Sequence, residues 1–137
     1  MRRRDERDKR TVNTEISCPD PRSLWEKALD LVGDDEHAAA HLLVLIADTN
    51  KTTLASLHEH FEVSRWEGVG TAAHRIAGSA RMLDCGALIA LLTALEAAAR
   101  AHNGELATAL VPVVAEAVAT LDNSIAKALW SEPDSTE

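Results

Sequence analysis

His74 is the residue whose surroundings most favour chemistry, and it lies in a stretch that reads as one long helix. In a 3.6-residue repeat its own face carries small and basic residues at −4, −3, +4 and +7, namely Gly70, Thr71, Gly78 and Arg81. The apolar residues of the stretch lie on another face, so we expect the imidazole to point away from the core. A glycine inside a helix costs about 1 kcal/mol relative to alanine. We interpret Gly78, and Gly70 one turn before the ring, as clearing space for a bulky group or a partner protein.

An accessible imidazole is a competent nucleophile near neutral pH, because histidine titrates at about 6.5. One ring nitrogen attacks while an acceptor holds the N–H of the other. A single histidine without this context is more often a surface or capping residue. The sequence has no Gly-rich phosphate loop of the P-loop or kinase type. We therefore expect no ATP site.

Residues 74–82 read HRIAGSARM. This segment resembles the signature of histidine-containing phosphotransfer (HPt) domains, which reads His-x-Leu-Lys-Gly-Ser followed by Ser or Ala. The resemblance continues in register to Glu96 through Leu88, Leu91 and Leu95, and in helix order it covers residues 20–130. The sequence of residues 74–82 is most similar to that of the modules fused to hybrid (unorthodox) sensor histidine kinases.

The resemblance implies a phosphorelay intermediate of two-component signalling rather than an enzyme. Nε2 of His74 would accept a phosphoryl group from a receiver-domain aspartate and pass it to a response-regulator aspartate, while Glu96 holds Nδ1. Mg²⁺ would belong to the partner receiver domain, so we expect no cofactor and no metal on this chain. The docking surface would surround the ring, with exposed positions of the preceding helix, and would consist of Gly70, Thr71, Arg75, Gly78 and Arg81.

Two positions depart from the family pattern. Ala77 stands where the family usually has a lysine that helps to hold the phosphoryl group or meets the partner. Arg81 is the first candidate to replace that lysine, and Arg75 is the second. Asp84 stands where the family often has a glycine between two helices, and we expect it to cap the following helix.

The elements that must position His74 are predicted to be helices. Hydrophobic residues make up 46% of the 137 residues, yet there is no Tyr and one Phe, so the core must be aliphatic and rich in alanine. No long stretch alternates apolar and polar residues, and we expect no sheet. The predicted fold is an all-α, antiparallel up-down-up-down four-helix bundle with a short additional N-terminal helix. Apolar periodicity predicts helices near 20–32, 35–61, 65–83, 84–102 and 104–130.

Local signals set the predicted helix ends. Asp20-Pro21 favours a helix start, and Asp34 or Asp35 would cap the second helix. Ser64 with a glutamate three residues on reads as a capping box. Pro112 must kink the last helix or begin its main part, because proline donates no backbone hydrogen bond.

Charge divides the chain into a body and two ends. The formal net charge of the chain is −8. Residues 1–10 hold six Lys/Arg and three Asp/Glu, a net charge of +3, so residues 11–137 carry −11. An acidic body argues against nucleic-acid binding. We expect residues 1–19 to be a disordered segment or linker, residues 20–130 to form the bundle, and residues 131–137 to be a disordered acidic tail.

The expected setting is cytoplasmic, including the cytoplasmic part of a membrane-bound sensor kinase. Cys18 and Cys85 read as reduced thiols, and no secretory signal follows the charged N-terminus. We expect no membrane contact by the domain itself, and a monomer. The apolar middle of the second helix, 42–46, also suits a contact with another chain.

The alternative function is a docking module that binds receiver domains without being phosphorylated. A metal-carboxylate bundle is a third possibility, but the chain lacks the paired Glu-x-x-His motifs of such sites. The sequence does not identify the cognate receiver or the input signal, and does not separate a free-standing protein from a kinase module.

Overall fold

The computed structural model describes residues 20–135, with side chains as far as Trp130. The segments 1–19 and 136–137 lie outside it, so the predicted disorder at the N-terminus is not addressed. Within the described part every regular element is a helix, which confirms the all-α prediction. The helices are α2 (Pro21–Leu31), α3 (Glu36–Glu62), α4 (Trp66–Met82), α5 (Gly86–Arg100) and α6 (Gly104–Ser135).

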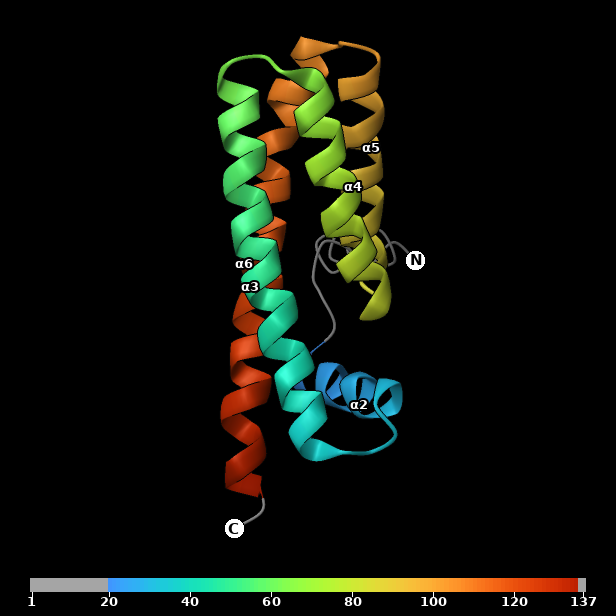
Figure 1. The fold of residues 1–137 in the computed structure, drawn as a ribbon, viewed down its shortest axis with the longest axis vertical. Coiled ribbons are helices and arrows are strands. Elements are labelled where there is room, and N and C mark those ends of the chain that lie inside the picture. The colour runs from blue at the N-terminus through green and yellow to red at the C-terminus, as the bar shows by residue number, and fades with distance from the viewer. Residues whose placement is uncertain (1–19, 136–137) are drawn as a thin grey trace, which may run out of the picture.

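Four of these helices form an antiparallel bundle. Each packs against the next in sequence, and α3 also packs against α6, so that α4 lies diagonally across from α6. The helices α3 and α6 are longer than α4 and α5, and α2 lies across their lower ends and packs on both (Figure 1). Leu24 and Ala28 of α2 are fully buried there. The short helix therefore covers apolar surface that α4 and α5 do not reach.

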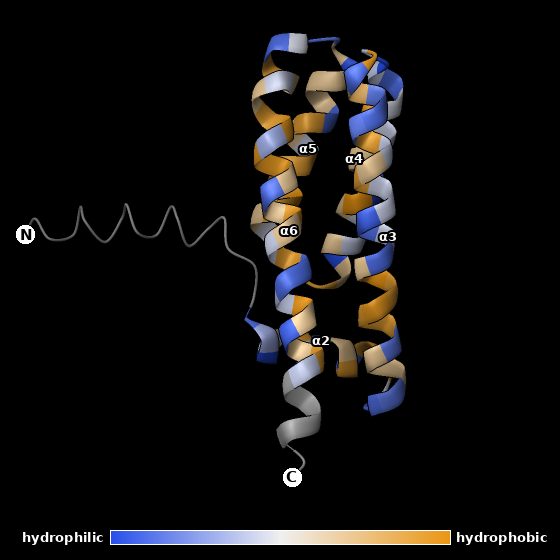
Figure 2. Ribbon diagram, turned by 90° about the vertical axis from the view of Figure 1, so that its left-hand side faces the viewer, coloured by the Kyte–Doolittle hydropathy of each residue, from blue (hydrophilic) through white to orange (hydrophobic). Residues whose placement is uncertain are grey.

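Aliphatic side chains fill the core, as the composition predicted. Among the fully buried residues are Leu43, Leu57, Ile76, Leu92 and Leu121. The hydrophobic colouring of α3 is concentrated toward α2 (Figure 2), where the apolar segment 42–46 lies. Leu43 and Ile46 of this segment are buried, whereas Val44 and Leu45 remain exposed.

Helix α6 is a wall of the bundle. Over Gly104–Trp130 it is long and apolar enough to cross a membrane by length and composition alone. In this structure its inner stripe, which includes Val114, Leu121 and Ile125, is buried against the other helices. The helix is continuous through Pro112, which is exposed, and it extends to Ser135. The sequence prediction had ended it near Trp130, so the helix includes most of the segment predicted as a disordered tail.

Two predicted helix starts are confirmed. The Asp20 carboxylate accepts a hydrogen bond from the backbone N–H of Ser23 at 2.8 Å, and the Asp35 carboxylate accepts one from Ala38 at 3.1 Å. Pro21 occupies the first helical position, as expected. The backbone of Gly33 adopts φ +70° just beyond α2, a left-handed conformation that suits a glycine after a helix C-terminus.

The predicted capping roles of Ser64 and Asp84 are wrong. Residues Arg65 and Cys85 occupy the N-cap positions of α4 and α5, and neither makes a side-chain capping bond. Ser64 and Asp84 instead adopt left-handed conformations, φ +57° and +59°, directly after the preceding helices. The N–H of Asp84 donates to Arg81 and that of Cys85 to Ala80, which is the paired pattern that closes a helix C-terminus.

This backbone conformation explains the departure from the family pattern at residue 84. Glycine is favoured at a left-handed position, and aspartate is among the few other residues that tolerate it. The Asp84 carboxylate also forms an ion pair with Lys27 of α2 at 2.9 Å. The side chain therefore links α2 to the α4–α5 connection, a contact that glycine does not offer.

One polar pair interrupts the apolar interior between α3 and α6. Asn50 is fully buried, and neither of its side-chain polar atoms has a hydrogen-bond partner within residues 20–135. One carboxylate oxygen of Asp122 is likewise buried without a partner. Burial raises the pKa of Asp122 above its ordinary value, although the nearby Asn50 amide acts in the opposite direction.

Candidate functional site

His74 projects from the middle of α4 toward solvent, as predicted. Its side chain is 63% exposed, whereas Ala73 beside it in sequence is fully buried. The core stripe of α4, which includes Val69, Ile76 and Ala80, holds the helix against its neighbours. The fold therefore fixes the backbone of His74 and leaves the ring accessible.

A chain of polar contacts runs from the histidine into α5. Nδ1 of His74 lies 3.3 Å from Oε1 of Glu96. The other carboxylate oxygen of Glu96 accepts two hydrogen bonds from Arg100, from Nε at 3.1 Å and from Nη2 at 2.6 Å. The Glu96 side chain is only 18% exposed, whereas those of His74 and Arg100 lie largely in solvent. The carboxylate is therefore held between a ring nitrogen and a guanidinium.

Electrostatics keeps that carboxylate ionised. The hydrogen bonds from Arg100 lower the pKa of Glu96 below its ordinary value, burial opposes this shift, and His74 adds to the lowering. An ionised carboxylate only accepts hydrogen bonds, so its contact with a neutral His74 ring requires the proton on Nδ1. The lone pair is then on Nε2, the other nitrogen of the exposed ring.

The two glycines near His74 have different roles. A Cβ built on Gly78 has no atom within 4 Å, and the residue is exposed. Close helix packing therefore does not explain this glycine. Gly70 is buried, and a Cβ there would lie 3.7 Å from the Cβ of Ala99 on α5. Its predicted place in the docking surface is wrong, because the four-residue step back from His74 turns toward α5 and into the α4–α5 contact.

The remaining predicted docking residues lie at the surface. Thr71, Arg75 and Arg81 are all exposed. Among the described residues no hydrogen bond or ion pair joins either arginine to His74. Ala77, at the position of the family lysine, is only 2% exposed and belongs to the core. This position therefore offers no charge to a group bound at His74.

Arg100 was missed in the sequence analysis. Glu96 and Arg100 are four residues apart on one helix, a spacing that pairs opposite charges. This local signal was available, but its relevance depended on knowing that Glu96 approaches His74. Thr71 and Arg75 also line a groove between α3 and α4, whose far wall no sequence pattern indicated.

Comparison with known proteins bears on this site. The profile of the Hpt domain family matches residues 41–124, more than half of the chain, and this range includes His74, Glu96 and Arg100. The chain belongs to the Hpt domain family. The matched range extends from α3 into α6, so it covers the four helices of the bundle in whole or in part.

The Hpt domain also resembles part of the virulence sensor protein BvgS. The sequences from Bordetella pertussis, Bordetella parapertussis and Bordetella bronchiseptica are each 34% identical to it over 79 residues. That alignment covers 58% of this chain, whereas the chain spans 6% of the length of these relatives. No solved structure gives a significant match. Membership of the Hpt family supports a phosphorelay role in two-component signalling, as a phosphotransfer module rather than an enzyme.

Proposed function

We propose that this Hpt domain accepts a phosphoryl group on Nε2 of His74 from the aspartyl phosphate of a receiver domain and passes it to a response-regulator aspartate. The observation that carries the proposal is the contact of Nδ1 with Glu96, because it directs the lone pair of the exposed ring to Nε2. Family membership and the open space beside Gly78 support it as well.

The transfer step needs few groups from this chain. The Nε2 lone pair attacks phosphorus and forms the N–P bond, while the P–O bond to the donor aspartate breaks and the carboxylate leaves with the electron pair. The ring becomes cationic, with its proton on Nδ1, and the ionised Glu96 carboxylate stabilises that charge. In the second transfer, an aspartate carboxylate attacks the phosphorus of phospho-His74, so that an O–P bond forms, the N–P bond breaks and the electron pair returns to Nε2. Mg²⁺ on the receiver would neutralise the charge of the phosphoryl oxygens.

The partner is accordingly a receiver domain of a hybrid sensor kinase, a response regulator, or both in turn. The similarity to part of the BvgS sensor protein supports a module within a larger cytoplasmic signalling protein. Thr71, Arg75, Gly78 and Arg81 would form the docking surface around the ring, and their exposure supports that role.

The alternative is a receiver-docking module that is never phosphorylated. Receiver domains from the source organism, charged with acetyl phosphate in the presence of Mg²⁺, would be incubated with the chain, and the product analysed by intact-mass spectrometry. We expect an acid-labile phosphoryl group that disappears in His74→Gln and persists in His41→Gln, a matched change at an exposed histidine of α3. Binding of a receiver with no labelling of His74 by any charged receiver would support the docking module instead.

A further inference from the structure

The helix that carries His74 also carries cations without partners. Eight of the 14 Lys and Arg residues follow residue 10, in a part of the chain with a net charge of −11. Some of these, such as Lys27 and Arg100, are paired with carboxylates. Arg65, Arg75 and Arg81 are exposed and form no ion pair among the residues that the structure describes. The surface of α4 therefore carries positive charge without carboxylate partners in an otherwise acidic part of the chain.

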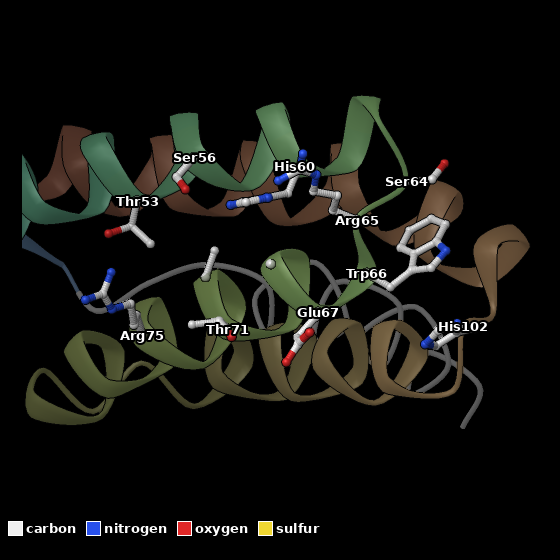
Figure 3. A pocket seen from close by; sticks show the side chains of 12 residues that line it. Thr53, Ser56, His60, Ser64, Arg65, Trp66, Glu67, Thr71, Arg75 and His102 are labelled. Carbon is white, nitrogen blue, oxygen red and sulfur yellow. The ribbon is translucent and has the colours of Figure 1, made fainter.

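Arg65 and Arg75 line the groove between α3 and α4, which has a volume of about 650 Å³. His60 and the hydroxyl residues Thr53 and Ser56 form the α3 wall, and Arg75 projects from α4 toward Thr53 (Figure 3). Glu67 is the single carboxylate among the lining residues. The groove therefore offers hydrogen-bond donors and positive charge, which suits an anionic occupant.

A hydroxyl in this groove is available to an occupant. Thr53 is 7% exposed, and no hydrogen bond to its side chain is formed by the described residues. The neighbouring Thr52 behaves differently, because its hydroxyl donates to the Asp48 carbonyl one turn back at 3.1 Å. The Thr53 side chain lines the groove, so a bound group there can form a hydrogen bond with its hydroxyl.

The spacing of the two arginines indicates the size of the occupant. Arg75 lies ten residues after Arg65, the N-cap residue of α4, which is about 15 Å along the helix axis. A single phosphate does not span this distance, whereas an extended peptide of four or five residues does. The net charge of −11 on residues 11–137 disfavours a long polyanion such as a nucleic acid. The groove suits a short peptide segment with carboxylates near both ends.

We infer that the α3–α4 groove is a recognition site for an acidic segment of the receiver domain that docks on His74. The inference rests on the proposed function for the identity of the partner. Thr71 and Arg75, at −3 and +1 from His74, belong to both the groove and the surroundings of the ring. A protein that reaches His74 therefore also covers the near end of the groove. Cations at both ends would set the register of docking and favour receivers that carry the matching acidic segment.

The first experiment measures the binding of an acidic peptide in the groove, without any phosphoryl transfer. A hexaglutamate peptide would be titrated into the ¹⁵N-labelled full chain at low salt and followed by ¹H–¹⁵N NMR. We expect saturable shifts at Thr53, Ser56 and Arg75 and a five- to tenfold weaker apparent affinity at those signals in Arg65→Gln, with recovery in Arg65→Lys. Arg22→Gln on α2 is the matched control and should change nothing. Shifts that are absent from the groove, or equally strong with a single-stranded oligonucleotide, would overturn the inference.

The second experiment uses a receiver that labels His74. In single-turnover transfer, Arg65→Glu should raise the receiver concentration that gives the half-maximal rate about tenfold and leave the maximal rate unchanged, because Arg65 is remote from the reacting atoms. Labelling of His74 by the small donor phosphoramidate should also be unchanged. An unaltered half-maximal receiver concentration would refute the role of the groove while leaving the proposed function intact. Failure of the unsubstituted chain to be labelled would refute the proposed function, and the NMR titration would still test the groove.

Discussion

Replacing Glu96 with glutamine tests how the site stabilises a phosphorylated histidine. Glutamine keeps an oxygen that can accept from Nδ1 of His74 and a side chain of the same length, but it removes the negative charge. The hydrogen bonds from Arg100 keep the pKa of Glu96 below its ordinary value, so the native side chain is ionised throughout neutral pH. The substitution therefore removes a full charge beside the ring that becomes cationic upon phosphorylation.

The magnitude follows from the geometry of the contact. A hydrogen bond to a charged group contributes about 1.5–3 kcal/mol, and the strongest such N–H···O⁻ bonds are about 2.7–2.9 Å long. Here the Nδ1–Oε1 distance is 3.3 Å, and the His74 side chain is 63% exposed. Solvent screening and the longer distance reduce the expected effect to about 1 kcal/mol, the value for two unit charges near 4 Å in water. That free energy corresponds to roughly a fivefold change in an equilibrium constant.

The assay is the equilibrium between phospho-His74 and the phosphorylated receiver. Receiver charged with acetyl phosphate is freed of the small donor and mixed with the Hpt domain, and the two phosphoproteins are quantified by intact-mass spectrometry. We expect Glu96→Gln to lower the equilibrium constant for formation of phospho-His74 about fivefold. Glu96→Ala should also lower the transfer rate, because no acceptor then holds Nδ1. Glu116→Gln on α6 is the matched control, since α6 lies diagonally across the bundle from α4.

An equilibrium constant that is unchanged in Glu96→Gln would refute the electrostatic role of the carboxylate. An unchanged transfer rate in Glu96→Ala would also remove its role in orienting the ring. Thermal unfolding of each variant separates these results from loss of the fold. That control is necessary because the Glu96 side chain is only 18% exposed and Arg100 loses its charged partner in both variants.

Four further predictions follow from the geometry. Arg100→Gln should reduce phosphoryl transfer less than Glu96→Ala does, and a double-mutant cycle should show that the two changes are not additive, because Arg100 acts on His74 through Glu96. Gly78→Ala should raise the free energy of unfolding by about 1 kcal/mol in urea denaturation, whereas Gly78→Leu should fold equally well but slow transfer from a receiver at least tenfold, since a side chain there meets only the docking partner. Ser64→Gly should stabilise the fold by about 0.5–1 kcal/mol because the backbone is left-handed at that residue, and Ser64→Ala should give no such gain. Burial raises the folded-state pKa of Asp122, so the native state holds this proton more strongly than the unfolded state does. Stability therefore falls as pH rises above the unfolded pKa of about 3.9. Asp122→Asn should stabilise the protein by about 1 kcal/mol at pH 7 and by less at pH 4, as measured by urea denaturation at both pH values.

Much of the fold could be predicted from the sequence because its signals are local. The apolar spacing along each helix, the caps at Asp20 and Asp35, and the absence of strand patterns depend on residues within a few positions of one another. The exposure of His74 follows from the same periodicity. Its relation to Glu96 was predicted by resemblance to a family, since no local rule places two residues on different helices in contact.

Only the tertiary structure separated residues that look equivalent in the sequence. Gly70 and Gly78 lie one turn to either side of His74, yet the position of α5 buries one and leaves the other open. Ser64 resembled a helix cap, but the path from α3 into α4 requires a left-handed residue at that position.

The charges around His74 depend on helix packing in the same way. The spacing of Glu96 and Arg100 is visible in the sequence, but the pair affects His74 only because α5 places the Glu96 carboxylate beside the ring. The groove beside Arg75 exists because α3 and α4 pack side by side. The sequence by itself determined which helices form and that His74 lies on an exposed helix face, because those properties are set within a few turns of one chain segment. Packing between helices decided which side chains hold and surround that residue.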